Sequence, residues 1–387
     1  MSAISSDPVQ LAASFVQIPA MSGDEEEMAE AVEAAMRQLG YRSVTCDRFG
    51  SVIGVAGPAG PPSLLFDGHM DVVPAVGDWT VDPFGAEFQG GRLYGRGTAD
   101  MKGGLAAAIC GVAKASARDE IDRPVAVSAT VLEETIEGVA LGAVLDELEP
   151  KAVVICEPSS LGIQIGQRGR AEIVVSARGI PAHSATPERG RNPIPLGARA
   201  LDAMEELPLP RDRWLGKGLL VPTDIVSDPY PSISLIPAEV RIRFDRRTVA
   251  GEEAAGVLGA VQATLELAEP GVFSAAISED EVMTYTGTRL SATRWLAPWL
   301  MRESHPLVRA AKQAVNLAGI DAHIGTYNFC TNGSESAGAR AIPTIGFGPG
   351  DAGMAHVVDE SVPIDEIRNA AEFYRQLSIV YTRRETT

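Results

Sequence analysis

Residues 63–74 read SLLFDGHMDVVP, and this stretch indicates the fold class. Its apolar run, SLLF, has the length of a buried strand, and His69 stands near the end of that strand. Further short apolar runs occur at 51–56, 125–132 and 152–156. A segment of helical composition, GGLAAAICGVAKAS, lies between two of these runs at 103–116. Such alternation predicts an α/β sheet with helices on its faces.

The middle third of the chain has a different pattern. Residues 171–178 and 239–245 alternate strictly between apolar and polar side chains, which is typical of strands with one face in water. Two helical patterns, around 194–206 and 252–267, accompany these strands. We therefore expect an inserted α+β domain at 170–298. Residues 1–169 and 299–387 would then form one discontinuous catalytic domain.

The composition excludes several classes of protein. A chain of 387 residues exceeds what one hydrophobic core usually fills, which agrees with two domains. The net charge of -18 disfavours nucleic acid and anionic membranes as partners, because both attract clustered Lys and Arg. We find no signal peptide and no apolar stretch near the length of a membrane span, so we expect a cytoplasmic protein.

Four scattered cysteines, Cys46, Cys110, Cys156 and Cys330, lack CxxC spacing. This spacing argues against a thiolate zinc site and against a disulfide scaffold. We expect these cysteines in the core.

His69 and Asp71 are the first candidates for site residues. Residues two apart in an extended segment share a face, so one imidazole nitrogen could bind a metal while the Asp71 carboxylate accepts the other N–H. Taken alone, such a pair is more often a histidine and an aspartate in an ordinary turn.

The segment GRGTADMKGG (95–104) provides the next candidate, Asp100. Its glycines fit neither a P-loop nor a dinucleotide fingerprint. Asp100 precedes the helix that begins near Gly104, where a carboxylate could bridge two cations. A plain helix N-cap is the more common role of an aspartate at this position.

Carboxylates also end two further strands. VSATVLEETIEG (127–138) ends its apolar run at Glu133 and Glu134, and AVVICEP (152–158) ends at Glu157. Paired carboxylates at the end of a buried strand are costly unless cations match them. One carboxylate could bind a metal while its neighbour, left free, takes a proton from water.

The last candidate is His356, which follows a glycine-rich turn in GPGDAGMAHVVDE (348–360). Two histidines and three carboxylates suffice for two divalent ions that share a bridging carboxylate. Ligation by nitrogen and oxygen alone suits zinc, cobalt or manganese, and open positions are typical of a catalytic site.

Taken in order, these motifs resemble the family of aminoacylases, acetylornithine deacetylases, succinyl-diaminopimelate desuccinylases and glutamate carboxypeptidase-like metallopeptidases. The resemblance also includes RGIPAHSATPERGRNPI (178–194) and covers nearly the whole chain. It implies a mixed-sheet α/β/α zinc-peptidase-like catalytic domain with an inserted lid domain through which homodimers form.

The resemblance also implies roles for the candidates. One metal would be held by His69, Asp100 and Glu157, and the other by Asp100, Glu134 and His356. Glu133 would be the general base and Asp71 would orient His69.

Residues outside these motifs would act on the substrate. His183 matches a lid histidine that stabilises the developing oxyanion, and Arg247 matches an arginine that binds the substrate carboxylate. An exposed loop histidine and a surface arginine are the alternatives. We also expect contacts from Asn192, Gly333 and Ser334. The loop CTNGSESAG (330–338) departs from the family pattern, which affects substrate recognition.

By this resemblance we expect hydrolysis of an amide bond in a small N-acyl amino acid by a metal-bridging water that Glu133 activates. FGPG (347–350) resembles the deacetylase and desuccinylase branch. The alternatives are a dipeptidase or carboxypeptidase that acts on short peptides and, more remotely, an inactive metal-binding sensor or scaffold.

Overall fold

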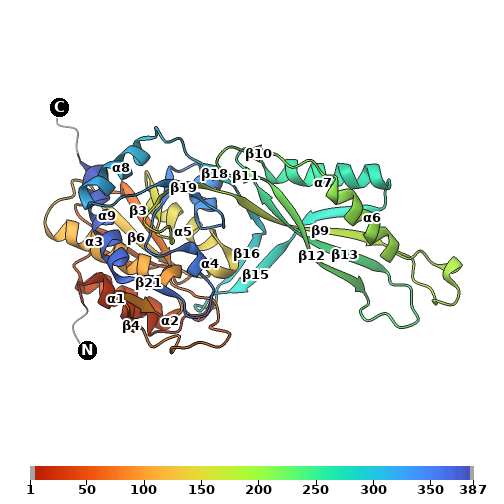
Figure 1. The fold of residues 1–387 in the computed structure, drawn as a ribbon, viewed down its shortest axis with the longest axis horizontal. Coiled ribbons are helices and arrows are strands. Elements are labelled where there is room, and N and C mark those ends of the chain that lie inside the picture. Colours follow the sequence, from red (N-terminus) through yellow and green to blue (C-terminus); the bar gives the residue numbers. More distant parts are fainter. Residues whose placement is uncertain (1–4, 384–387) are drawn as a thin grey trace. The chain divides into compact units, whose positions relative to one another are not determined.

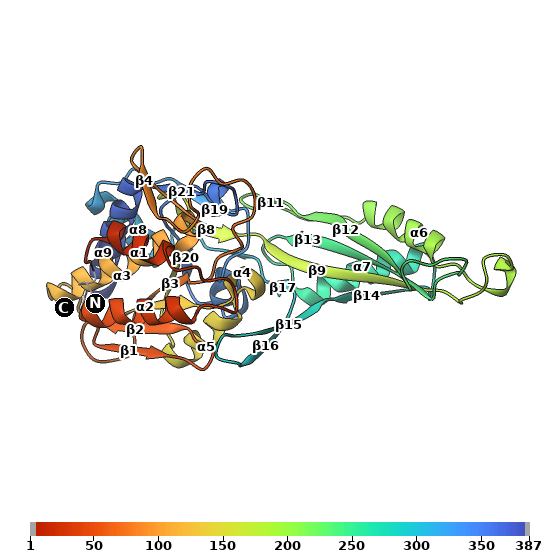
Figure 2. The same cartoon turned by 90° about the horizontal axis from the view of Figure 1, so that it is seen from below.

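The computed structural model describes residues 5–383, which divide into two compact units. Unit 1 extends to Gln167 and also includes Glu281–Leu290 and the chain from Leu300 onward. Unit 2 consists of Arg168–Asp280 and Ser291–Trp299. Figures 1 and 2 show the elements of each unit from two directions.

Unit 1 is built on a mixed sheet that has nine strands within the described residues. The strand order is β1-β2-β6-β3-β7-β20-β8-β18, with β19 beside β8. Pairs β3–β6, β3–β7 and β7–β20 are parallel, whereas β1–β2 and β2–β6 are antiparallel. The strands are β1 (Ser43–Cys46), β2 (Val52–Ala56), β3 (Leu64–His69), β6 (Val125–Thr130), β7 (Val153–Ile155), β8 (Ile163–Gln167), β18 (Trp299–Leu300), β19 (Ile324–Tyr327) and β20 (Thr344–Gly346). A separate small sheet joins β4 (Glu87–Gln89), β5 (Arg92–Tyr94) and β21 (Ser361–Pro363).

Helices cover both faces of the large sheet (Figures 1 and 2). Adjacent residues of β3 point to opposite faces: Leu65 packs with Leu141 of α5, whereas Phe66 contacts the ring of Tyr374 in α9. The helices of unit 1 are α1 (Pro8–Val16), α2 (Glu26–Gln38), α3 (Gly103–Ala117), α4 (Glu133–Ile136), α5 (Val139–Leu148), α8 (Pro306–Ala318) and α9 (Ile364–Thr382). This arrangement confirms the predicted mixed-sheet α/β/α architecture.

Small residues let α3 approach its neighbours closely. A Cβ on Gly104 would lie 2.2 Å from the carbonyl oxygen of Cys156, and one on Gly111 would lie 2.4 Å from that of Ala371. Any larger side chain at either position would push α3 away from the sheet or from α9. The helical composition of GGLAAAICGVAKAS therefore also sets the depth at which α3 packs.

Unit 2 has an antiparallel sheet of strand order β12-β13-β9-β14, with β17 beside β9. Helices α6 and α7 pack on one face, over a core that includes Ile173, Phe244 and Val261. The elements are β9 (Gly169–Arg178), α6 (Ile194–Glu205), β12 (Leu219–Asp228), β13 (Glu239–Thr248), α7 (Ala254–Ala268), β14 (Phe273–Ile277), β17 (Trp295–Leu296) and the short pair β10 (Arg211–Asp212) and β11 (Gly216–Lys217).

One stretch of the expected insert at 170–298 groups with unit 1 instead. The hairpin of β15 (Glu279–Met283) and β16 (Arg289–Thr293) has its tip, Glu281–Leu290, in unit 1. The Tyr285 hydroxyl donates to the carbonyl oxygen of Gly50 over 3.0 Å, and the Thr286 hydroxyl donates to that of Arg48 over 2.9 Å. These hydrogen bonds attach the hairpin tip to unit 1.

The expectation that all four cysteines are core residues was half right. Cys110 and Cys156 are buried, but Cys46 is exposed and Cys330 is partly exposed. Cys46 is the last residue of β1, an edge strand of the large sheet whose last two residues are exposed. Among the helices of residues 5–383, none is long and apolar enough to span a membrane.

Candidate metal centre

Three neighbouring strands, β6, β3 and β7, run parallel and end at the same edge of the unit 1 sheet. His69 ends β3 and pairs with Thr130, which ends β6. Asp67 pairs with Ile155, which ends β7. Ligand sites of α/β sheets form outside the carboxyl ends of such strands.

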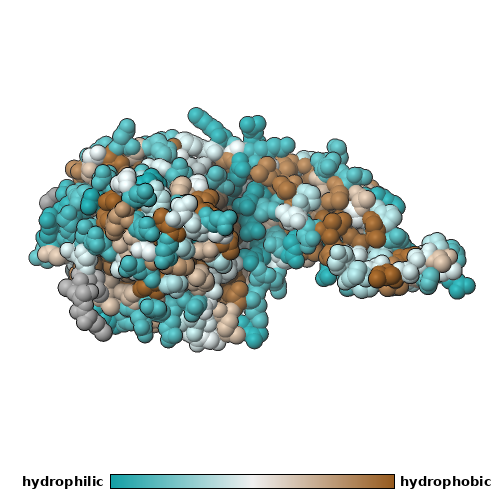
Figure 3. Space-filling model, turned by 60° about the horizontal axis from the view of Figure 1, so that its bottom comes forward, coloured by the Kyte–Doolittle hydropathy of each residue, from teal (hydrophilic) through white to brown (hydrophobic). Residues whose placement is uncertain are grey.

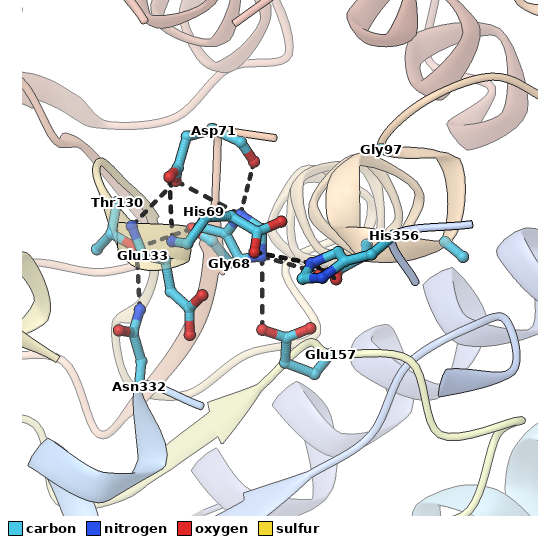
Figure 4. A network of polar contacts seen from close by, with 12 residues as sticks. Gly68, His69, Asp71, Gly97, Thr130, Glu133, Glu157, Asn332 and His356 are labelled. Atoms are coloured by element: carbon cyan, nitrogen blue, oxygen red, sulfur yellow. Dashed lines mark hydrogen bonds and ion pairs between the residues drawn. The ribbon is translucent and has the colours of Figure 1, made fainter. Parts of the chain in front are cut away.

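The contacts between the five predicted ligands bring them together at this edge. Figure 4 labels three of them, His69, Glu157 and His356. Glu134 lies in α4, which follows β6, and Glu157 follows β7 directly. Asp100 comes from the turn before α3, and His356 comes from the loop before β21. Segments from the first and last thirds of the chain therefore meet in one cluster.

The Nε2 atom of His69 faces two carboxylates. Nε2 lies 3.1 Å from Oδ1 of Asp100 and 3.5 Å from Oε1 of Glu157. The His69 side chain is only 1% exposed. Burial by itself lowers the pKa of His69, but the hydrogen bonds to Asp100, Asp71 and Glu157 raise it well above its ordinary value.

The role of Asp71 differs in detail from the expectation. Nδ1 of His69 lies 2.8 Å from the backbone carbonyl oxygen of Asp71 and 3.6 Å from its carboxylate. The carboxylate instead accepts hydrogen bonds from the backbone N–H groups of Glu133 and Glu134, both at 3.1 Å, and from the Ser22 hydroxyl at 2.7 Å. These stronger partners hold the carboxylate over the turn that begins α4.

His356 completes the second side of the cluster. Its Nε2 lies 2.9 Å from Oε2 of Glu134 and 3.3 Å from Oδ2 of Asp100. Asp100 thus presents Oδ1 to His69 and Oδ2 to His356. Burial tends to raise the pKa of Asp100, but the two imidazoles lower it below its usual range. In this position the Asp100 carboxylate could bridge two cations.

The other carboxyl groups hold protons more tightly than usual. Burial first, and the Asp100 charge next, raise the pKa of Glu157 to about 8 and that of Glu134 to about 7. Burial raises the pKa of Glu133 well above its ordinary value. Four carboxyl groups in so small a volume repel one another, so a cation stabilises their ionised forms.

Unpartnered oxygens show that the cluster fits divalent ions. Oε1 of Glu133, Oε1 of Glu134 and Oε2 of Glu157 are buried and have no hydrogen-bond partner among the described residues. Ligand atoms of His69, Glu133 and Glu157 lie within 4.8 Å of one another, as do those of His69, Asp100 and Glu134. A buried ionised carboxylate without a partner destabilises the fold by about several kcal/mol, because the group has lost its hydration. Divalent cations with nitrogen and oxygen ligands relieve that cost.

A buried polar network lies beside the ligand cluster, and the sequence patterns did not reveal it. The Asn332 amide donates to Asp67 over 2.9 Å and to the Thr130 hydroxyl over 3.1 Å, and its oxygen accepts from the Gly138 N–H over 2.7 Å. Ser128 donates to Asp67 over 2.6 Å. This network joins loop 330–338 to the strands that end at the cluster.

Two buried glutamates behind the ligands were also missed. Glu25 accepts a hydrogen bond from the Leu132 N–H over 3.1 Å, where Leu132 has a positive φ of 58°. Glu360 accepts bonds from the backbone of the turn that holds Asp100. The only signals in the sequence were the acidic neighbours in SGDEEE (22–27) and HVVDE (356–360), which do not reveal such long-range partners.

Three predicted substrate residues belong to unit 2. His183 is exposed, and its Nδ1 accepts a hydrogen bond from the Ala185 N–H over 3.0 Å. Arg247 donates to Asp245 with Nε at 2.7 Å and Nη2 at 3.3 Å. Asn192 is exposed, and its Oδ1 accepts a hydrogen bond from the Ile194 N–H over 3.0 Å. Their roles toward a substrate stay predictions.

The other two predicted substrate residues lie in unit 1. Ser334 is 3% exposed, and its hydroxyl accepts a hydrogen bond from the Gln167 amide over 2.8 Å. The Gly333 N–H donates to the Thr331 hydroxyl over 3.0 Å. The Gly333 N–H is therefore occupied by a protein partner, whereas the Ser334 hydroxyl accepts one hydrogen bond and still has a proton to donate.

Comparisons with known proteins agree with this geometry. The profile of peptidase family M20/M25/M40 matches residues 65–379. The chain is 29% identical over 379 residues to the uncharacterized protein YgeY of Escherichia coli (strain K12), with 96% of this chain and 93% of that protein covered. It is 29% identical over 400 residues to a succinyl-diaminopimelate desuccinylase of Rhodospirillum centenum, with 95% and 96% covered.

Solved structures show the same fold. Aminopeptidase PepT from Bacillus cereus superposes with a TM-score of 0.76 at 18% identity, over 99% of this chain and 100% of that chain. YXEP from Bacillus subtilis, described as a dinuclear metal binding peptidase, gives a TM-score of 0.71 at 12% identity, over 97% of both chains.

The family profile spans most of the chain, and the residues that converge at the sheet edge suit divalent metal ions. The chain therefore belongs to peptidase family M20/M25/M40, and it is a metal-dependent hydrolase of amide or peptide bonds.

Proposed function

We propose that this chain removes the acyl group from a small N-acyl amino acid with two zinc ions, which cobalt or manganese could replace. Relatives of nearly full coverage bear the name succinyl-diaminopimelate desuccinylase, which supports a deacylase. The observation on which the mechanism rests is Glu133, a buried carboxyl group with one unpartnered oxygen beside the ligand cluster.

In this proposal one ion is held by His69, Asp100 and Glu157, and the other by Asp100, Glu134 and His356. When bound, the ions supply Lewis acidity that polarises the amide carbonyl and lowers the pKa of a water molecule. The remaining chemistry belongs to side chains of this protein.

Glu133 is the general base. Its carboxylate takes a proton from the attacking water and later delivers that proton to the leaving amine nitrogen as the carbon–nitrogen bond breaks. Burial, which raises the pKa of Glu133, favours the protonated intermediate state between these two transfers. Asp71 holds the backbone of Glu133 and Glu134, so the base and its neighbouring ligand keep a fixed separation.

Unit 2 contributes substrate contacts in this proposal. The exposed imidazole of His183 would donate a hydrogen bond to the oxyanion, and Arg247 would bind the substrate carboxylate. Arg247 would have to exchange part of its present pairing with Asp245 for that carboxylate. Asn192, Gly333 and Ser334 are further candidates near the substrate.

We also propose that two copies associate through unit 2. Strand β12 is an edge strand, and it exposes Leu219 at 41%, Val221 at 48% and Ile225 at 54%. Figure 3 shows hydrophobic residues, in brown, at the surface of the molecule. A long edge strand with exposed apolar side chains readily pairs with another strand. A second copy of the chain offers the same edge and would cover these side chains.

An activity screen tests the proposed reaction. The metal-free protein is loaded with zinc, cobalt or manganese and incubated with N-acetyl, N-succinyl and N-carbamoyl amino acids and with dipeptides, and the products are identified. We expect turnover of an N-acyl amino acid with release of the free amino acid. Turnover of dipeptides alone would support the peptidase alternative instead.

A further inference from the structure

Glu360 is a fully buried carboxylate that the mechanism does not use. Its Oε2 accepts hydrogen bonds from Nη1 of Arg96 at 2.7 Å and from the N–H of Gly97 at 3.0 Å. Its Oε1 accepts from the N–H of Ala99 at 2.9 Å and from that of Asp100 at 3.1 Å. Four donors thus surround one carboxylate that is 0% exposed.

Glu360 differs from the ligand carboxylates in its satisfied oxygens. Glu133, Glu134 and Glu157 each keep one buried oxygen without a partner, whereas both oxygens of Glu360 accept two hydrogen bonds. Glu360 therefore has no oxygen left for an ion. Its contacts all go to the turn that holds Asp100.

That turn needs an external support. Gly97 has a φ of 84°, and Asp100 has non-helical backbone angles although α3 begins shortly after it. The N–H groups of Ala99 and Asp100 bond to Glu360 rather than to a helical carbonyl. The position of the Asp100 carboxylate between the two imidazoles thus depends on backbone that Glu360 holds.

Glu360 also lies on the segment that holds the other histidine. It follows His356 closely in sequence, and its carbonyl oxygen accepts from the Gly95 N–H over 2.9 Å. The next residue, Ser361, pairs with Tyr94 in the small sheet. One residue therefore joins the segment of Asp100 to the segment of His356.

We propose that Glu360 is a positioning residue that holds the Asp100 turn against the His356 segment, so that the Asp100 carboxylate bridges two divalent ions. This inference rests on the proposed role of Asp100 as a metal ligand. A glutamine cannot replace Glu360, because its single amide oxygen would serve only two donors and its NH2 group would face the other two.

Zinc affinity tests this inference. Metal-free wild type, Glu360→Gln, Glu360→Asp, Asp100→Asn and Asp47→Ala are titrated with Zn²⁺ against a chromophoric chelator, and their thermal unfolding is followed without metal. Asp47 is the matched control: its Oδ1 accepts bonds from the N–H groups of Phe49, Gly50 and Ser51 in a turn without predicted ligands.

We expect Glu360→Gln to bind zinc about 10- to 100-fold more weakly than wild type, the loss typical of residues that hold metal ligands in place. Asp47→Ala removes all three of these bonds, so it should lower the unfolding temperature yet bind zinc as wild type does. Glu360→Asp keeps the negative charge but has a side chain shorter by one methylene group. Its zinc affinity should therefore lie between those of wild type and Glu360→Gln. If Glu360→Gln does not fold, Glu360→Asp decides the question by the same titration.

The failures of the two proposals are distinguishable. Wild-type zinc affinity in the glutamate variants, together with a loss in Asp100→Asn, would overturn the role of Glu360 alone. Wild-type affinity in Asp100→Asn would overturn the ligand set itself. Equal losses of zinc affinity in Asp47→Ala and Glu360→Gln would show that general destabilisation causes the effect, which would also overturn the role of Glu360.

Discussion

The carboxylate of Asp71 accepts the backbone N–H of Glu133 over 3.1 Å. The same carboxylate bonds to the next N–H along the chain, and the carbonyl oxygen of Asp71 lies 2.8 Å from Nδ1 of His69. One residue thus contacts a proposed ligand histidine through its backbone and the proposed general base through its side chain. This double attachment leads to the first prediction.

Asp71→Asn should lower kcat by about 10- to 100-fold, because one of its carboxylate oxygens is replaced by an NH2 group that cannot accept a backbone N–H. Ser22→Ala is the matched control, since it removes the 2.7 Å hydroxyl bond to Asp71 and leaves both backbone bonds intact. Steady-state kinetics of the two variants measure the difference. Equal rates for Asp71→Asn and wild type would contradict the positioning role.

The metal-free protein should lose stability as the pH rises from about 4.5 to about 8. The folded-state pKa values of Glu134 (about 7) and Glu157 (about 8) exceed the unfolded value of 4.5, so the folded state binds more protons in this window. His356, with its pKa raised to about 10, adds a loss of the same sign above pH 6.5. The pKa of Asp100 is lowered in the folded state, so its proton binding differs between the folded and unfolded states only below about pH 4.

Zinc should abolish most of this pH dependence, because bound ions replace the protons that the carboxyl groups hold. Urea unfolding at pH 6 and pH 8, with and without zinc, measures both effects. A metal-free protein that is more stable at pH 8 than at pH 6 would contradict the raised pKa values of Glu134 and Glu157.

Asn332→Ala should destabilise unit 1 without touching a proposed ligand. The substitution removes the hydrogen bonds to Asp67, Thr130 and Gly138 inside a buried network. Each unsatisfied buried polar group costs about 1–3 kcal/mol, so the free energy of unfolding should fall by at least this amount. Asn316→Ala, at an exposed position of α8, is the control and should change it by less than about 0.5 kcal/mol.

Ile225→Lys should prevent dimers if β12 forms the interface. A charge in the middle of an edge strand opposes pairing with a second strand. Leu267→Lys alters a residue of α7 that is 88% exposed and should leave association unchanged. Sedimentation velocity of the wild type and both variants distinguishes these cases. A monomeric wild type, or a dimeric Ile225→Lys variant, would contradict the proposed interface.

The ligand cluster could be predicted because it depends on local patterns. Each of β3, β6 and β7 contains a short apolar run. Strand β3 ends at His69, β6 is followed by Glu133 and Glu134, and β7 is followed by Glu157. The carboxyl ends of parallel neighbours meet at one edge, so residues at those ends come together in space.

The supporting residues could not be predicted in the same way. Glu360 contacts backbone more than 250 positions earlier in the chain, and Asn332 contacts Asp67 at a separation of 265. Their partners are N–H groups and a buried aspartate, which no pattern of side-chain types reveals. The hairpin tip at 281–290 was assigned to the insert for the same reason, since only its hydrogen bonds to Arg48 and Gly50 show where it belongs.

The general base is the central claim, and Glu133→Gln tests it most directly. The variant keeps the size of the side chain and all proposed ligands but cannot take a proton. Zinc content by elemental analysis and kcat on the substrate found in the screen are measured together. We predict unchanged zinc content and a kcat lower by about 100- to 10,000-fold. Wild-type turnover by the zinc-loaded variant would contradict the assignment of Glu133 as the base.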